Sequence, residues 1–283
     1  MLGKIETYKV DRETDIGYTL IKDGKEYFLH RNETNFAKLK AKDLIKGFLY
    51  LDKKGREAVT MIIPKVTVDV AGYGKVISVN HSLGCFIDIG ISKDILLSKD
   101  NLPYNLDYWP EVDSLLLGIL RVKKDKLYFN ILRKDEIMNL ARNPQDLDYS
   151  VNYEGLVYFA GEKGINLITE DLNLIFIASE NLRKNYQLGE KVEFRITEKL
   201  ADKTYLGMLP GGVLSNIEHD SKVILDYLKS HRGTMPYSSK TSPLIIERVF
   251  SMSKSSFKKA LGNLYKKGEV ELLDDKTILK RTI

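Results

Sequence analysis

The sequence contains few of the residues that crosslink a chain, bind metal or cross a membrane. Its 283 residues include one cysteine, which excludes an internal disulfide framework and a cysteine-based zinc site. No apolar run approaches the roughly 20 residues of a membrane helix. The first residues also lack the apolar segment of a signal peptide. We therefore expect a cytoplasmic protein that makes no membrane contact.

Motifs of catalysis and cofactor binding are missing as well. The sequence has no glycine-rich phosphate loop ending in Lys-Ser or Lys-Thr, no His-Glu-x-x-His and no Gly-x-Ser-x-Gly. Its four histidines are scattered, and the group of His219, Asp220 and Asp226 is interpreted as surface charge and helix capping. We predict a protein that is not an enzyme and has no cofactor and no metal.

Basic residues are concentrated at the C-terminal end. The sequence has 44 Lys and Arg against 39 Asp and Glu, a formal net charge of +5. Residues 215–283 contain 13 of the basic and 8 of the acidic residues, so residues 1–214 are formally neutral. The attraction for a polyanion is therefore predicted to come mainly from the C-terminal part.

Three short apolar runs in the middle of the chain predict antiparallel strands. They span residues 72–79, 84–90 and 95–98 and are separated by Gly, Asn and charged residues. Because successive side chains of a strand point to opposite faces, Ile87 should face the core and Phe86 the other side.

An aromatic ring on that polar face, beside Lys75 and Lys93, offers a platform on which a nucleic-acid base can stack. A ring covered by a loop is the alternative interpretation.

The same plan occurs three times along the chain. Residues 27–30, 95–98 and 175–178 each form an apolar run that is followed by a polar stretch and two further strand-like runs. Five predicted strands in about 65 to 75 residues fit a small Greek-key barrel of the OB type. The spacing fits other small barrels, such as the SH3 type, equally well.

The central unit resembles the S1-type RNA-binding module of ribosomal protein S1, which is an OB-fold barrel. The resemblance is carried by Gly-x-Val at 74–76, Gly-x-Phe-Ile-Asp-Ile-Gly at 84–90 and Ile-Leu-Leu-Ser at 95–98. The family has a histidine in the last of these strands, and Leu96 stands at that position here.

The first and third units are degenerate copies of this pattern. Thr19 and Asn166 stand at the position of Phe86. Phe28 and Phe176 occupy the position of the family's histidine.

Two further features lie within or between the repeats. Trp109, the only tryptophan, is interpreted as a partly buried anchor. Residues 134–141 predict a short connecting helix that ends at Asn143-Pro144.

From residue 210 onward the apolar period changes from 2 to 3.6, which predicts helices after a boundary at Pro210-Gly211-Gly212. The predicted elements are a helix capped by Asp220 or Ser221, a helix opened by Ser242-Pro243, a helix from Ser253 to Gly268, and strands at 269–272 and 277–280. Three helices and a terminal hairpin resemble a winged helix-turn-helix domain.

The third of these helices has a basic outer side. The residues predicted there and on its flanks are Ser255, Lys258, Lys259, Gly262, Asn263, Lys266 and Lys267. Positive charge beside a residue without a side chain suits contact with a phosphate backbone. An ordinary solvated face and a protein-contact surface are the alternatives.

The predicted fold is therefore mainly β with a C-terminal α+β domain: three tandem five-stranded OB barrels of S1 type and a winged helix-turn-helix. The predicted domain limits are 1–64, 65–134, 135–212 and 213–283. This arrangement resembles the bacterial conserved virulence factor B (CvfB) family over essentially the whole chain. The resemblance implies an RNA-binding regulator of gene expression that acts post-transcriptionally and, in pathogens, on virulence genes.

The residues themselves predict a non-enzymatic, multi-module protein that binds single-stranded RNA. The predicted RNA contacts are Phe86, Lys75, Phe28, His30, Phe176, Arg121, Lys254, Lys258, Lys259, Asn263 and Lys266. The alternatives are a DNA-binding transcriptional regulator that uses the winged helix, and an adaptor associated with the ribosome or the transcription machinery. The sequence leaves the oligomeric state open.

Overall fold

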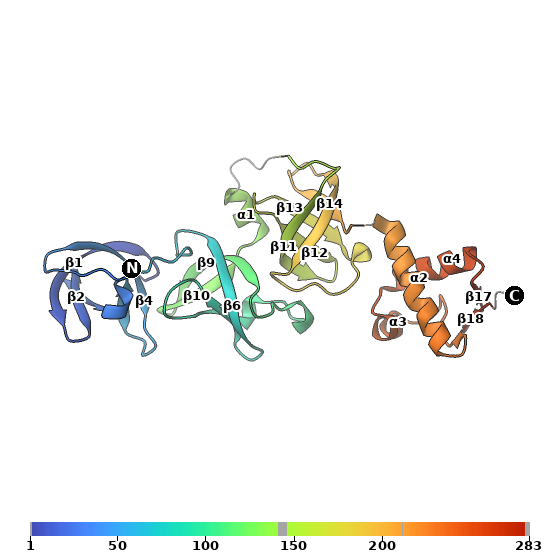
Figure 1. Ribbon diagram of the computed structural model, residues 1–283, viewed down its shortest axis with the longest axis horizontal. Coiled ribbons are helices and arrows are strands. Elements are labelled where there is room, and N and C mark those ends of the chain that lie inside the picture. The colour runs from blue at the N-terminus through green and yellow to red at the C-terminus, as the bar shows by residue number, and fades with distance from the viewer. Residues whose placement is uncertain (1, 141–145, 211, 281–283) are drawn as a thin grey trace. The chain divides into compact units, whose positions relative to one another are not determined.

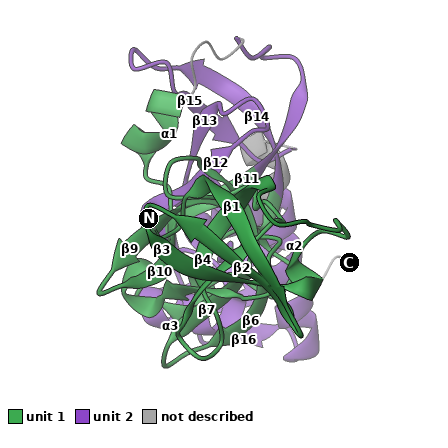
Figure 2. Cartoon of the chain, turned by 90° about the vertical axis from the view of Figure 1, so that its left-hand side faces the viewer, with its two compact units in different colours: residues 1–143, 156–160, 187–191 green, residues 144–155, 161–186, 192–283 purple. Residues whose placement is uncertain are grey.

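Three closed five-stranded barrels are followed by a small domain of helices and a three-stranded sheet (Figure 1). The computed structural model describes residues 2–140, 146–210 and 212–280, without the side chains of residues 212–216. Two compact units divide the chain: residues 1–143, 156–160 and 187–191 form the first, and residues 144–155, 161–186 and 192–283 form the second (Figure 2). The predicted fold class is confirmed.

The three barrels share one strand order. Barrel 1 consists of β1 (Ile5–Thr14), β2 (Gly17–Lys22), β3 (Lys25–His30), β4 (Leu44–Leu51) and β5 (Glu57–Thr60). Barrel 2 consists of β6 (Gly72–Asn80), β7 (Gly84–Asp88), β8 (Ile95–Ser98), β9 (Leu115–Lys123) and β10 (Lys126–Ile131). Barrel 3 consists of β11 (Asn152–Gly161), β12 (Gly164–Ile168), β13 (Leu174–Ala178), β14 (Lys191–Lys199) and β15 (Tyr205–Met208). In each barrel the first three strands are followed around the sheet by the fifth and then the fourth, which confirms the predicted repeat.

A glycine opens the second strand of every barrel because this strand approaches the third at very short range. A Cβ atom on Gly17, Gly84 or Gly164 would lie 2.1, 2.0 or 2.1 Å from a carbonyl oxygen of the third strand. The carbonyl groups belong to Leu29, Leu97 and Ile177, respectively. Since no side chain fits at that distance, these positions require glycine.

The same third strand ends in a 3-10 turn in each barrel. The turns span Arg31–Glu33, Lys99–Asn101 and Ser179–Asn181. They coincide with the polar stretches that the sequence places after each repeated apolar run.

Burial alternates along β7 as the sequence predicts. Cys85 and Ile87 are fully buried, whereas Phe86 and Asp88 are half-buried. Burial also raises the pKa of the Cys85 thiol to about 11.

Trp109 is buried and its indole Nε1 donates a hydrogen bond to the carbonyl oxygen of Pro103 at 2.7 Å, which confirms it as an anchor.

The connecting helix is present as α1 (Lys134–Leu140). Its predicted end at Asn143-Pro144 lies outside the described residues. In this helix Ile137 is buried.

The C-terminal domain has the elements of a winged helix. They are α2 (Gly212–Ser230), β16 (Thr234–Met235), α3 (Pro243–Phe250), α4 (Lys254–Lys266), β17 (Val270–Leu272) and β18 (Thr277–Leu279). The three helices pack around a core that includes Ile224, Ile246, Phe257 and Leu264. Ser253 caps α4, because its hydroxyl accepts a hydrogen bond from the backbone N–H of Ser256 at 3.1 Å. The sheet order is β16-β18-β17, and the sequence did not predict β16.

The predicted start of the first C-terminal helix is wrong. α2 begins at Gly212, so Asp220 and Ser221 lie inside the helix and do not cap it. Ser221 is buried, and its hydroxyl donates to the carbonyl oxygen of Ala260 at 3.3 Å. A serine that packs one helix against another has the same sequence signature as a serine that caps a helix.

We expect the Cys85 thiol to resist a thiol-specific reagent at neutral pH in the native protein. Its burial in barrel 2 blocks access and its raised pKa disfavours the reactive thiolate. Colorimetric thiol titration should detect almost none in the native state and one thiol per chain after denaturation. Rapid labelling of the folded protein would contradict the buried position.

Candidate nucleic-acid interface

In each barrel, one position on the second strand lies opposite one on the third strand, and one of the two residues is a phenylalanine. In barrel 2, Phe86 of β7 lies directly opposite Leu96 of β8. The corresponding pairs are Thr19 with Phe28 in barrel 1 and Asn166 with Phe176 in barrel 3. This register confirms the predicted equivalence of the positions. The ring therefore comes from the second strand in barrel 2 and from the third strand in barrels 1 and 3.

All three rings lie on the outer side of their sheet. Phe28, Phe86 and Phe176 are half-buried, and the residue that follows each of them points inward and is fully buried. Part of each ring thus remains accessible. In barrel 1 the His30 ring lies 6.2 Å from the Phe28 ring in an edge-on arrangement, and its Nδ1 accepts a hydrogen bond from the Asn32 N–H at 3.1 Å.

The face of barrel 2 that carries Phe86 continues onto two more strands. Tyr128 of β10 lies opposite Leu96, and Arg121 of β9 lies opposite Tyr128. Arg121 is exposed and forms an ion pair with Glu136 at 2.7 Å. The predicted contact Arg121 is therefore placed in the same row of residues as the Phe86 ring.

Lys75 lies at the edge of this face, opposite Asp88 of β7. Its ammonium group forms an ion pair with Asp113 at 2.6 Å, and the hydrogen bond to Asp113 raises the pKa of Lys75. Exposed ion pairs contribute little to stability, so Lys75 can exchange the Asp113 carboxylate for a phosphate oxygen.

Basic residues gather around the turn between the fourth and fifth strands of barrels 1 and 2, which a charge count along the sequence missed. The exposed cations are Lys53, Lys54 and Arg56 in barrel 1 and Lys123, Lys124 and Lys126 in barrel 2. In OB folds this turn acts together with the second and third strands in binding oligonucleotides. The signal in the sequence is a Lys-Lys pair followed by Gly or Asp between two predicted strands.

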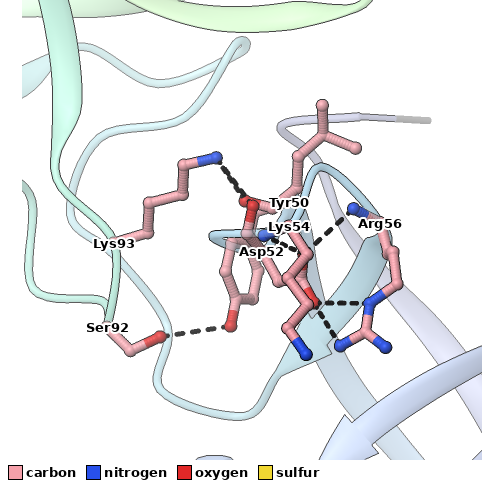
Figure 3. A network of polar contacts seen from close by, with 7 residues as sticks. Tyr50, Asp52, Lys54, Arg56, Ser92 and Lys93 are labelled. Carbon is pink, nitrogen blue, oxygen red and sulfur yellow. Dashed lines mark hydrogen bonds and ion pairs between the residues drawn. The ribbon is translucent and has the colours of Figure 1, made fainter.

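Asp52 shapes the turn of barrel 1 (Figure 3). Its Oδ1 accepts hydrogen bonds from the backbone N–H groups of Lys54 at 2.8 Å and Arg56 at 3.0 Å. Its Oδ2 accepts from the Arg56 guanidinium at 2.7 and 2.9 Å. Burial opposes ionisation of Asp52, but these hydrogen bonds lower the pKa of its carboxyl group. The turn therefore has a defined shape, with Lys53 and Lys54 left exposed.

Lys93 of barrel 2, which the sequence places near Phe86, bonds to this turn of barrel 1. Its ammonium group donates to the carbonyl oxygens of Leu51 at 2.7 Å and Asp52 at 3.0 Å (Figure 3). Burial lowers the pKa of Lys93; the charge of Asp52 opposes this shift and the charge of Lys126 adds to it. The hydrogen bonds arise because the β7–β8 connection, which carries Lys93, reaches the end of β4.

Two fully exposed aromatic rings were also missed. Phe36 and Tyr104 occupy matching places, three residues after the 3-10 turns Arg31–Glu33 and Lys99–Asn101, and have relative exposures of 102% and 105%. Rings with no packing role are candidates for stacking on bases. The sequence signal is an aromatic residue within a polar loop after the third strand of a repeat.

In the C-terminal domain the outer side of α4 is basic, as predicted. Lys258, Lys259 and Lys266 are exposed, and Lys254 at the first turn is half-buried. Tyr265 is also exposed on this helix, at 56%. A second helix of a helix-turn-helix with such a face is the part that usually meets nucleic acid.

The prediction that Asn263 lies on this outer side is wrong. Asn263 is half-buried, and its amide Nδ2 donates to the Ser221 hydroxyl of α2 at 3.0 Å. Residue 263 lies between the buried and exposed sides of α4, and the packing of α2 against α4 determines that its side chain faces α2. Asn263 therefore joins two helices and does not belong to the basic face.

Among the described residues no three His, Cys, Asp or Glu side chains come together in a way that could hold a metal ion. In the same part of the chain no helix has the length and apolar character needed to span a membrane.

Three family models match the chain. A CvfB-like winged helix domain matches residues 222–279, an S1 domain matches residues 2–62, and a CvfB first S1-like domain matches residues 71–130. S1 and winged-helix domains are nucleic-acid-binding types and not enzyme families.

Relatives cover most of the chain. The protein YitL of Bacillus subtilis is 32% identical over 270 residues, which cover 95% of this chain and 90% of YitL. Conserved virulence factor B of Staphylococcus epidermidis is 30% identical over 243 residues, which cover 83% of this chain and 79% of that protein. A crystal structure of a multidomain protein with nucleic acid binding domains from Streptococcus pneumoniae matches with a TM-score of 0.65 and 30% identity, and covers 99% of this chain and 98% of its own.

Replacement of Gly262 tests the basic face of α4. We expect Gly262→Glu to weaken nucleic-acid binding roughly tenfold, about 1.4 kcal/mol, because it adds a carboxylate among Lys258, Lys259 and Lys266. A Cβ atom at Gly262 meets nothing within 4 Å, and glutamate is a better helix former than glycine, so the fold should be retained. Fluorescence anisotropy at one salt concentration gives the Kd.

Gly262→Ala is the matched control for this variant. It should bind as the parent protein does and be more stable to unfolding by up to about 1 kcal/mol, since alanine has the higher helix propensity. Equal affinities of all three proteins would show that α4 does not lie at the bound nucleic acid.

Proposed function

Because the chain belongs to the conserved virulence factor B (CvfB) family, we propose that it is a cytoplasmic RNA-binding protein that regulates gene expression after transcription. The observation that carries the proposal is the phenylalanine at the same cross-strand site of all three barrels. Its relatives named conserved virulence factor B support virulence genes as targets in pathogens. We also propose the domain limits 1–64, 65–134, 135–212 and 213–283.

Single-stranded RNA suits these sites better than a duplex. A half-buried ring on a barrel surface can stack on a base only if that base is free of its own neighbours. Each such stack contributes about 1–3 kcal/mol, and Phe28, Phe86 and Phe176 provide three of them. The remaining proposed contacts are Lys75, His30, Arg121, Lys254, Lys258, Lys259 and Lys266.

The lysine-rich turns add a salt-dependent contribution. Lys53 and Lys54 in barrel 1 and Lys123 and Lys124 in barrel 2 are exposed beside the proposed stacking strands. Each phosphate that they neutralise on a single strand contributes about −0.7 to the slope of log K against log salt. Stacking on the rings supplies the part of the affinity that salt changes less.

Two other functions have one observation each in their favour. A DNA-binding regulator would use the basic face of α4, which occupies the position of a recognition helix. An adaptor for the ribosome or the transcription machinery would use α3, where Leu244 and Ile245 are 79% and 44% exposed. Neither alternative accounts for the repeated phenylalanine.

A comparison of strand types tests the proposal. We expect the full-length protein to bind an unstructured RNA more tightly than an RNA or DNA duplex of equal length, because only the single strand presents unstacked bases. Gel-shift titrations at one salt concentration give the three affinities. Equal or tighter binding of duplex DNA would make the transcriptional regulator the better assignment.

Removal of one ring tests the stacking site itself. We expect Phe86→Ala to lower the affinity for single-stranded RNA by about 1–3 kcal/mol, with little change in melting temperature because the ring is only half-buried. Phe159→Ala is the matched control, since Phe159 is an exposed ring, 56% accessible, on β11 and outside the second and third strands. A lower melting temperature with unchanged affinity would assign Phe86 a packing role instead.

A further inference from the structure

A cavity lined mainly by barrel 1, with two residues of barrel 2, is not explained by the shared barrel plan. It has a volume of about 450 Å³, which lies within the usual range for small-ligand sites. Its lining includes Phe28, Glu33, Tyr50 and Lys54 from barrel 1 and Ser92 from barrel 2. The cavity therefore combines an aromatic ring, a carboxylate and a cation.

Glu33 is the unusual residue in this lining. It is the last residue of the 3-10 turn after β3, and its backbone carbonyl accepts a hydrogen bond from the Met61 N–H at 2.8 Å. The residue is 93% buried, because its relative exposure is 7%. Its Oε2 is buried and has no hydrogen-bond partner among the described residues. A buried acceptor without a donor is unfavourable, so this carboxylate is suited to a donor supplied by a ligand.

Most other polar groups around the cavity already have partners. The Tyr50 hydroxyl shares a hydrogen bond with the Ser92 hydroxyl at 3.1 Å, and the Lys93 ammonium donates to backbone carbonyls (Figure 3). Arg56 is held by Asp52. The groups that remain for a ligand are the Glu33 Oε2, the Phe28 ring, the His30 ring and the exposed lysines of the turn.

We propose that this cavity is a base-specific subsite that selects guanine in a bound RNA strand. The proposal rests on the proposed function and adds a sequence preference to it. In the subsite the base lies against Phe28, its N–H groups donate to Glu33, and the adjoining phosphates lie toward Lys53 and Lys54.

Guanine is the base whose hydrogen-bonding edge fits a carboxylate. Its N1–H and its N2 amino group are adjacent donors on the Watson–Crick edge. Adenine and cytosine each present one amino group next to a ring nitrogen that is an acceptor, and uracil presents one N–H between two carbonyl oxygens. An acceptor that faces the Glu33 oxygens would repel them, so these three bases bind less well.

The other two barrels lack this acid. The residues that end the matching 3-10 turns are Asn101 in barrel 2 and Asn181 in barrel 3. Asn101 is exposed, in contrast to buried Glu33. The preference for guanine is therefore a property of barrel 1 alone, whereas the stacking site is common to all three barrels.

Short uridine oligonucleotides that carry one central guanosine, inosine, adenosine or uridine test the subsite with the full-length protein. Wild-type protein should bind the guanosine oligonucleotide on the order of tenfold more tightly than the adenosine one. Inosine, which lacks the N2 amino group, should fall between them. In Glu33→Gln, which keeps the side-chain shape, the preference should disappear while the affinity for the all-uridine strand is unchanged. Melting temperatures confirm that the variant is folded.

Glu26→Gln is the matched control, because Glu26 lies on β3 of the same barrel but is exposed. It should retain the full preference. Equal affinity of the wild-type protein for all four oligonucleotides would overturn the subsite and leave RNA binding intact. A preference that survives in Glu33→Gln would also overturn it. No binding to any of the four would overturn both the subsite and the proposed function.

Discussion

The close approach of the second strand to the third is the constraint on which each barrel depends. Where a glycine lies against a carbonyl oxygen of the neighbouring strand, as Gly84 does against Leu97, the two strands have only one register. In a strand pair, a slip of one residue would exchange the buried and outer faces. The same contact therefore buries Cys85 and Ile87 and keeps Phe86 outside. Core packing and the surface available for binding are set together by one steric condition, which is repeated in all three barrels.

Much of the fold could be predicted because its elements are short and sharply bounded. The strands of barrel 2 end at Gly, Asn and charged residues, and the turn-forming types limit where each strand can begin. The start of α2 could not be found in this way, because no strong breaker separates Gly212 from Ser221. Asn263 was misplaced for a related reason. The helical period gives the side of α4 on which Asn263 lies. Whether that side is exposed depends on where α2 packs, and here α2 covers Asn263.

The site was predicted less completely than the fold, because it depends on neighbours that are distant in sequence. The three phenylalanine positions follow from strand alignment alone. The cavity at Glu33 brings together residues of the 3-10 turn, β4 and the Ser92 segment, and no local sequence pattern encodes that arrangement. The distribution of charge on the surface also cannot be read from a count of charged residues along the sequence. Residues 1–214 are formally neutral, yet Asp52 bonds within its own turn and leaves Lys53 and Lys54 exposed. A net charge of zero thus coexists with strongly basic local surfaces.

Lys93 makes a direct contact between barrels 1 and 2, because its ammonium group in barrel 2 donates hydrogen bonds to the backbone of barrel 1. When a polymer is bound to one barrel, its binding to the other is intramolecular. The effective concentration for that second contact is then set by the geometry of the Lys93 contact and not by a flexible linker. The affinity of the polymer then depends on whether its length reaches from one ring to the next. If the Lys93 contact were lost, the chain between β5 and β6 would still join the two barrels. The effective concentration for the second contact would then be set by that linker and would depend less sharply on the length of the polymer.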